Sequence, residues 1–128
     1  MLELAQIPLL SKDRGGLENI VFAGGVCAVN PEPLADFIDF FSLGEGEDIT
    51  VEILQLYDRA KAEGWSKDAF LHEAAKIPGV YVPGFYRHEY NANGTLAAIV
   101  PLEGVPQTVT KRIIEDLDNA YFPTKMIV

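Results

Sequence analysis

Two short apolar runs, each followed by glycines, constrain the fold of this chain more than any other feature. The first run covers residues 20–23 and is followed by Gly24 and Gly25, and the second covers residues 40–43 and is followed by Gly44. Runs that are almost continuously apolar, not apolar at alternate positions, are typical of parallel strands buried on both faces. The chain is therefore expected to adopt an α/β fold in which these runs form neighbouring parallel strands with flanking helices.

The glycines mark the expected carboxyl ends of the two strands, which is where open α/β sheets bind ligands. Glycine permits a sharp turn there and lets the main chain approach a ligand closely. The candidate cofactor-binding residues are therefore Gly24, Gly25, Gly44, Glu45 and Gly46. Any turn from a strand to a helix uses glycines in the same way, so turn geometry alone also explains them.

Acidic side chains are concentrated in the same part of the chain, because residues 17–49 contain seven of them and no Lys or Arg. Three of them, Glu45, Glu47 and Asp48, could bind a cation through carboxylate oxygens. Acids are also favoured in the first turn of a helix by its dipole, and we favour that interpretation, so no metal site is predicted. The alternative is a small metal-dependent enzyme centred on Glu45 and Glu47. A calcium or magnesium titration without a shift in melting temperature would exclude it.

The composition of the chain argues against several function classes. The net charge of −9 argues against a nucleic-acid-binding surface, because such a surface needs a basic patch. The single cysteine, Cys27, allows neither an internal disulfide nor a cysteine-built cluster, and it is expected to be a small packing residue. His72 and His88 have no sequence context for a catalytic triad or a zinc site, so no catalytic residue is predicted. Neither a signal peptide nor a membrane-length apolar stretch is recognisable, which favours a cytoplasmic location.

Two short helices are predicted in the first third of the chain. Residues 1–10 are expected to form one of them, with Leu4 among its inward-facing residues. Asn30, followed by Pro31, is a favourable start for the other, because Asn caps a helix and Pro suits its first position. On that helix we expect Leu34 to pack inward and Asp39 to face water.

Two longer helices and a hairpin are predicted after the second strand. Asp48 is expected to cap a helix over residues 49–63 that Gly64 ends, and Ser66 to cap a second helix over residues 67–76. The Asn-Gly pair within residues 91–94 predicts a tight turn between strands at residues 85–90 and 95–100. The aromatic residues near this hairpin are expected to pack in the core or in an interface, namely Tyr81, Phe85, Tyr86 and Tyr90.

Two parallel strands and three helices do not complete a doubly wound sheet. We divide the chain into a partial α/β region, residues 1–77, and a β-hairpin with an extended connector, residues 78–128. The missing part of the sheet is expected to come from the hairpin, from another copy of the chain or from further segments of a longer polypeptide. The apolar residues 126–128 favour the last of these.

Several of these motifs together resemble a known family. Residues 22–25, NPEPLADF at residues 30–37 and GEGE at residues 44–47 are similar to the region ahead of the catalytic core in certain radical S-adenosylmethionine (radical SAM) proteins. In those proteins this region is a cobalamin-binding-like domain. Residues 77–83 and 111–124 resemble the connector that leads into the core. The resemblance covers most of the chain and implies a partial Rossmann-like, cobalamin-binding-like module.

The catalytic groups of that family have no counterpart here. Its three-cysteine motif, which ligates an iron–sulfur cluster, lies beyond the connector, and Cys27 is unrelated to it. The Asp-x-His-x-x-Gly loop that supplies the lower cobalamin ligand is also absent. The resemblance therefore implies no cofactor in this chain and gives no support for cobalamin binding. It implies an iron–sulfur cluster and S-adenosylmethionine in the parent protein.

Two functions follow as expectations. In the first, the chain is a non-catalytic accessory region of a radical SAM iron–sulfur oxidoreductase, which positions the core domain of the same polypeptide and, where the parent uses one, a corrinoid or a substrate. In the second, it is a stand-alone interaction module that completes its sheet by forming a homo-oligomer.

Overall fold

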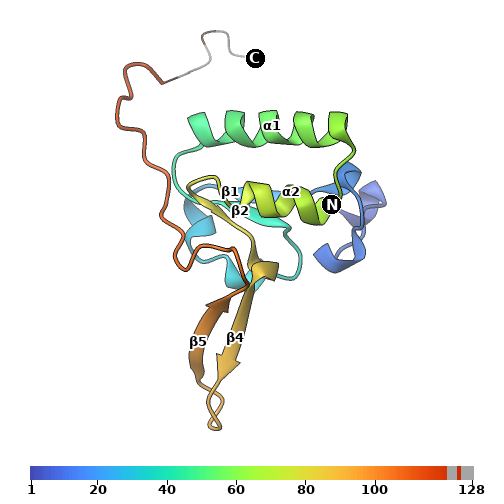
Figure 1. Ribbon diagram of the computed structural model, residues 1–128, viewed down its shortest axis with the longest axis vertical. Helices are drawn as coiled ribbons and strands as arrows, with labels where there is room; N and C mark the ends of the chain where they lie inside the picture. Colours follow the sequence, from blue (N-terminus) through green and yellow to red (C-terminus); the bar gives the residue numbers. More distant parts are fainter. Residues whose placement is uncertain (121–123, 125–128) are drawn as a thin grey trace.

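A computed structural model describes residues 1–120 and 124 of the chain. Within these residues the chain has a mixed α/β structure, with a three-stranded central sheet, two α-helices and a separate hairpin (Figure 1). Residues 121–123 of the predicted connector and the apolar residues 126–128 lie outside the described residues. The strands and helices are β1 (Phe22–Gly24), β2 (Phe40–Ser42), α1 (Gly46–Glu63), α2 (Lys67–Ala74), β3 (Val80–Tyr81), β4 (Tyr86–Tyr90) and β5 (Leu96–Pro101).

The central sheet has the strand order β1–β2–β3. β1 and β2 run parallel, with Phe22 opposite Phe40, which confirms that the two apolar runs are neighbouring parallel strands. β3 runs antiparallel to β2, with Tyr81 opposite Phe41. The sequence did not indicate this third strand, because two residues are too few to show a periodic pattern. An α/β fold is confirmed, whereas the mixed sheet leaves the predicted Rossmann-like architecture unconfirmed.

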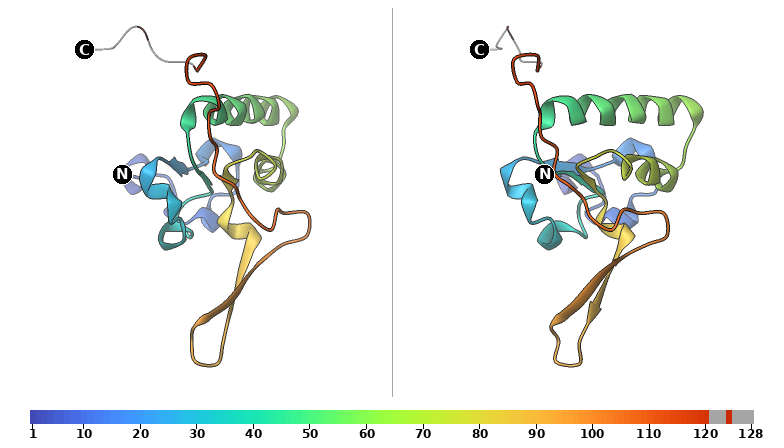
Figure 2. Two further views of the ribbon diagram at one scale, coloured as in Figure 1. Left: turned by 90° about the vertical axis from the view of Figure 1, so that its left-hand side faces the viewer. Right: turned by 60° about the vertical axis from the view of Figure 1, so that its left-hand side comes forward.

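β2 is buried on both faces, as predicted. Phe40 and Phe41 are 0% and 1% exposed, and they point to opposite faces of the sheet because side chains alternate along a strand. Phe40 packs with Ile53 of α1 and Phe70 of α2, while Phe41 packs with Tyr81 on the other face. The two helices therefore cover one face of the sheet (Figure 2).

β1 lies at the edge of the sheet, which corrects the prediction that both runs are fully buried. The ring of Phe22 stacks on that of Phe40, with centroids 5.1 Å apart, but Phe22 remains 45% exposed. Within the described residues, no strand pairs with the outer edge of β1. Among the described residues, the apolar run is therefore covered by a neighbouring strand on one side only.

The two predicted short helices are single 3₁₀ turns. Glu3–Ala5 forms the first, and Leu4 is 87% exposed, so the prediction that it packs inward is wrong. Glu32–Leu34 forms the second, with Pro31 at the N-cap position instead of Asn30 and with Leu34 half-exposed. Both turns are too short to bury an apolar stripe, because a stripe needs residues three and four positions apart on one face.

The two longer helices are confirmed, with one change at the start. α1 begins at Gly46, and Glu45 occupies its N-cap position, so the prediction of Asp48 as the cap is wrong. Gly64 ends α1 in the left-handed conformation, with φ of 69°, and Ser66 caps α2 by accepting a main-chain N–H at 3.1 Å. Neither helix of the described chain has the length and apolar character of a transmembrane segment.

The hairpin is confirmed close to its predicted position. β4 and β5 pair antiparallel, with His88 opposite Ile99, and Gly94 takes a φ of 81° in the turn. The hairpin projects away from the central sheet and pairs only with itself among the described residues (Figures 1 and 2). It therefore does not supply the missing part of the central sheet. The division at residues 77 and 78 stays a prediction, and β3, which lies beyond it, belongs to the central sheet.

Candidate functional site

The structure brings the predicted strand-end glycines to one edge of the sheet. Gly24 lies opposite Ser42 in the parallel pair, so Gly25 and Gly44 follow at the same carboxyl end of β1 and β2. Gly25 and Gly44 have φ of 92° and 103°, values that residues with a Cβ rarely adopt. The sharp turns that the sequence predicted are therefore present.

At this carboxyl end of the sheet, the end of β2 is covered by a later segment of the chain. Gly44 forms an isolated parallel bridge with Arg112. The Arg112 N–H donates to the Leu43 carbonyl at 2.8 Å, and the Glu45 N–H donates to the Arg112 carbonyl at 3.1 Å. The Ile114 N–H donates to the Glu45 carboxylate. We call residues 111–114 the strap; it pairs with the Leu43 carbonyl and the Glu45 N–H, on either side of Gly44, whereas Gly24, Gly25 and Gly46 remain exposed. Whether these five residues bind a cofactor stays a prediction.

The acidic residues at this end of the sheet lie at the N-terminus of α1. Glu45 is the N-cap, and Glu47 and Asp48 lie in the first turn, where the helix dipole favours negative charge. In the part of the chain that the structure describes, no group of three or more His, Cys, Asp or Glu side chains is placed to share a metal ion. The described geometry thus gives these acids a structural role.

A buried ionic cluster, which the sequence did not predict, lies at the opposite end of β2. Asp39 is 2% exposed, so the prediction that it faces water is wrong. Its carboxylate accepts hydrogen bonds from the side chains of Arg14 at 3.0 Å and Ser11 at 2.5 Å, and from the Val21 N–H at 2.7 Å. The Lys67 ammonium group lies 2.6 Å from the same carboxylate. One carboxylate therefore joins the N-terminal segment, β1 and α2.

The donors in this cluster are fully used. Besides Asp39, the Arg14 guanidinium donates to the carbonyls of Pro8, Leu9 and Phe37 at 2.7–3.0 Å, which uses all five of its N–H groups. Lys67 donates in addition to the carbonyls of Ser11 and Arg14, at 2.7 and 2.9 Å.

A cavity of about 560 Å³ opens onto this cluster, between the N-terminal segment, the start of α2 and Phe85. Its walls are mixed, with apolar residues such as Leu71 beside polar ones such as Lys12 and Asp68, and a ligand in it would find no free donor on Arg14 or Lys67. We conclude that the cluster is a structural clamp. The signal that the sequence offered was an acid directly before a fully buried strand.

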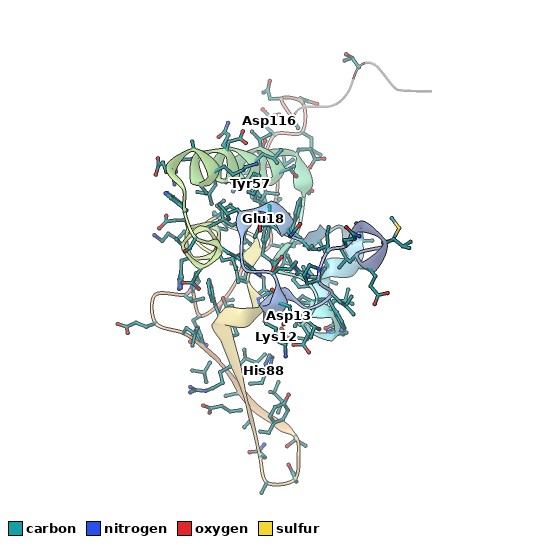
Figure 3. All side chains as sticks on the ribbon, turned by 90° about the vertical axis from the view of Figure 1, so that its right-hand side faces the viewer. Lys12, Asp13, Glu18, Tyr57, His88 and Asp116 are labelled. Carbon is teal, nitrogen blue, oxygen red and sulfur yellow. The ribbon has the colours of Figure 1, made fainter. Side chains whose placement is uncertain are left out.

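A second polar cluster joins the hairpin to the central sheet. The Tyr81 hydroxyl donates to the Glu32 carboxylate, and the same carboxylate lies 2.9 Å from Nε2 of His88. His88 sits near the root of the hairpin (Figure 3). Burial, and then the hydrogen bond to Glu32, raise the pKa of Tyr81 well above its ordinary range. His88 thus has a partner, which the sequence did not reveal because the two residues are far apart along the chain.

The other residues with reactive side chains have ordinary surroundings. The His72 ring stacks on that of Phe85, with centroids 4.2 Å apart, and His72 lies 3.7 Å from Asp68, one turn earlier on α2. Cys27 is exposed on the 3₁₀ turn Val26–Val29, so the expectation that it packs in the interior is wrong. These contacts assign His72 a packing role, and among the described residues no hydrogen bond or ion pair involves the Cys27 side chain.

The comparisons with known proteins gave one match. A family model described as "Radical SAM proteins, N-terminal" matches residues 1–83, which is 83 of the 128 residues. The matched span contains the whole central sheet, α1 and α2, and it ends before β4. No curated protein and no solved structure matches the chain.

Proposed function

The chain belongs to the family of N-terminal regions of radical SAM proteins, and we propose on this premise that it is a non-catalytic accessory region that positions the catalytic core of its parent protein. The observation that carries the proposal is the uncovered outer edge of β1. The family match supports the nature of the partner, because it describes this region as the one that precedes the rest of a radical SAM protein.

The edge of β1 has the properties of a surface that another segment covers. Its Phe22 is 45% exposed, and Val26 and Val29, on the turn that follows, are 89% and 74% exposed. An apolar strand edge offers unpaired main-chain groups together with side chains that prefer a dry contact. We propose that the core domain of the same polypeptide packs against this edge.

The cofactors of the family belong to the parent protein in this proposal. Membership implies an iron–sulfur cluster and S-adenosylmethionine there. A cluster of the kind that the sequence resemblance implies needs three cysteine thiolates, and this chain has the single, exposed Cys27. The residues present here do not fit that group, so we assign no step of radical chemistry to them.

Positioning of a corrinoid is a narrower version of the same proposal. A lower axial ligand would have to come from His72 or His88, which contact Phe85 and Glu32. Mixing the protein with hydroxocobalamin tests it directly: a spectral shift with co-elution would support corrinoid binding. Neither change is expected, because both imidazoles already have partners.

The test of the accessory role has two steps. The first is to read the coding sequence beyond Val128: a Cys-x-x-x-Cys-x-x-Cys motif is expected there, and its absence contradicts the proposal. The second is to express residues 1–128 and the core as separate chains and to measure their association by titration calorimetry. We expect Phe22→Asp to weaken association at least about tenfold, as for a central contact residue.

The matched control is Leu54→Asp. Leu54 is 52% exposed on α1, so this variant makes the same chemical change at an apolar residue away from the β1 edge. It is expected to leave association within about twofold, because residues outside an interface contribute little. Equal effects of the two variants, or no association of the unmodified chains, would count against the proposal.

The same edge supports the second function, a stand-alone module that completes its sheet by self-association. Light scattering of the 128-residue protein separates the two. A dimer that Phe22→Asp dissociates would favour self-association. A monomer that binds the separately expressed core would favour the accessory role.

A further inference from the structure

The strap continues the pairing of β2 at the point where β3 begins. The Leu43 N–H donates to the Gly79 carbonyl at 2.8 Å, and the Leu43 carbonyl accepts from the Arg112 N–H at 2.8 Å. The N–H and C=O of one strand residue point to the same side, so β3 and the strap lie along the same side of β2. β3 pairs with residues 41 and 42 of β2. The strap takes the place of a neighbouring strand for the residues that follow, 43–45.

The strap fits only because glycines make room for it. An added Cβ at Gly44 would lie 2.1 Å from the Arg112 carbonyl oxygen and 2.6 Å from its nitrogen. An added Cβ at Gly79 would lie 3.2 Å from the Arg112 Cβ. Contacts below 3 Å with main-chain atoms cannot be relieved by a side-chain rotation. The strap can therefore pack on this position only because residue 44 is a glycine.

Two contacts that involve side chains hold the strap in place, besides its main-chain hydrogen bonds. Arg112 forms an ion pair with Glu52 of α1 at 2.5 Å, with side chains 22% and 39% exposed. The Ile114 N–H donates to the Glu45 carboxylate at the N-cap of α1. A partly exposed ion pair is weakened by salt, so the attachment of the strap depends on ionic strength.

The attachment is also limited in extent. The pairing with β2 is a single isolated bridge. Ile113 and Leu117 are 59% and 65% exposed, and a cavity of about 430 Å³ lies between Asp48 of α1 and residues of the segment 112–120, those of the strap included. Few buried contacts are lost when such a segment lifts, and segments of this kind open at low free energy.

We propose that the strap is a releasable cover over the carboxyl end of β2, with a docked and an open state. In the docked state it occupies the Glu45 N–H and the Leu43 carbonyl, and it lies against Gly44. A partner that pairs with the Leu43 carbonyl or the Glu45 N–H must therefore displace it. The inference goes beyond the accessory role, because it concerns the opposite side of β2 from the β1 edge and holds for the chain alone.

The experiment is limited proteolysis of the full 128-residue protein with trypsin, which cleaves after Lys111 and Arg112. The rate is compared with that of a synthetic peptide of residues 106–120, which has no docking partner. We expect cleavage at these sites to be at least about tenfold slower in the protein, because a protease needs an extended, unpaired main chain. Added salt at about 0.5 M is expected to reduce this protection severalfold.

Three variants test the contacts. Gly44→Ala is expected to remove most of the protection through its clash with Arg112, and Glu52→Gln to reduce it severalfold and to abolish the effect of salt. Gly25→Ala is the matched control: Gly25 has a φ of 92°, but a Cβ there has no atom within 4 Å. Like Gly44→Ala, this variant places a Cβ at a positive φ, but it does not touch the strap, and its protection is expected to equal that of the unmodified protein.

The outcomes separate the alternatives. Cleavage of the unmodified protein as fast as the peptide would overturn the docked state. Unchanged protection in Glu52→Gln, at low and high salt, would overturn the role of the ion pair even if Gly44→Ala fails to fold. None of these results depends on Phe22 or on the core, so the strap and the accessory role can fail independently.

Discussion

At the scale of single residues, the Asp39 carboxylate determines how the N-terminal segment is attached. It is buried and pairs with both Arg14 and Lys67. Desolvation makes a buried ion pair a modest source of net stability, but removing one member leaves the others buried and unpaired. The cluster therefore matters more for keeping the segment in one position than for adding free energy.

Asp39→Asn is expected to destabilise the fold by about 3–5 kcal/mol, because the amide keeps the shape of the carboxylate but leaves two buried cations without a counter-charge. Urea unfolding followed by circular dichroism measures the change. Asp36→Asn, at an exposed acid three residues before Asp39, is the control and is expected to change stability by less than about 0.5 kcal/mol. Similar values for the two variants would mean that the cluster does not hold the segment.

The pH dependence at high pH is a second property of single residues. Burial and the hydrogen bond to Glu32 raise the pKa of Tyr81, and burial raises the pKa of Tyr86. Between the unfolded pKa of about 10 and the folded pKa, the unfolded chain binds fewer protons than the native one. The stability from these tyrosines is therefore fully present below about pH 10 and is lost as pH rises through the folded pKa.

Tyr81→Phe is expected to make the melting temperature fall less steeply between about pH 9 and 11, because the variant lacks the group whose pKa differs most between the two states. Melting curves followed by circular dichroism at each pH measure this. An identical slope in the variant and the unmodified protein would show that Tyr81 titrates alike in both states.

At the scale of elements, local signals decided where α1 and α2 begin and end. Gly64 and Ser66 close one helix and open the next as the sequence predicts, since a left-handed glycine and a hydroxyl cap act within a few residues. The start of α1 was misplaced because Glu45, Glu47 and Asp48 are all suitable near a helix N-terminus. Only the direction of the chain leaving β2 selects among them.

Ser66→Ala is expected to cost about 1 kcal/mol of stability, because the main-chain N–H that the hydroxyl satisfies at 3.1 Å loses its partner. Thermal or urea unfolding measures it. Thr50→Ala, at an exposed position inside α1, is the control, and it is expected not to destabilise because Ala is a better helix former than Thr. A loss at Thr50 as large as that at Ser66 would contradict a capping role.

At the scale of the whole molecule, the chain consists of a helix-covered sheet and a hairpin that stands apart from it. The sheet has its core around Phe40 and Phe70. The side chains of the hairpin are largely exposed, with Tyr90 at 66% and Leu96 at 48%. Its root contacts the rest of the molecule: the Tyr86 ring lies 4.9 Å from that of Tyr81 in β3, and His88 pairs with Glu32. The two parts are therefore expected to differ in local stability.

Amide hydrogen exchange measured by NMR is expected to show this difference. The N–H groups of β4 and β5 should exchange at least about tenfold faster than those of β2, because an isolated hairpin is marginally stable in water. Equal protection of the hairpin and the central sheet would indicate a contact that covers the hairpin in solution.

The sequence by itself determined the parallel pairing of the two apolar runs, the glycine turns at their ends, the two longer helices and the hairpin. These features depend on residues close together in the chain, where periodicity, capping and turn chemistry act. The motifs in the first part also carried the family resemblance, which the match over residues 1–83 confirmed.

Only the tertiary structure decided the third strand, the exposure of Phe22, the burial of Asp39 and the docking of the strap on Gly44. Each of these depends on a partner that is remote in sequence: β3 for β2, Arg14 and Lys67 for Asp39, Arg112 for Gly44. Local preferences carry no information about such partners, because the free energy that selects them comes from burial and pairing between segments that meet only when the chain folds.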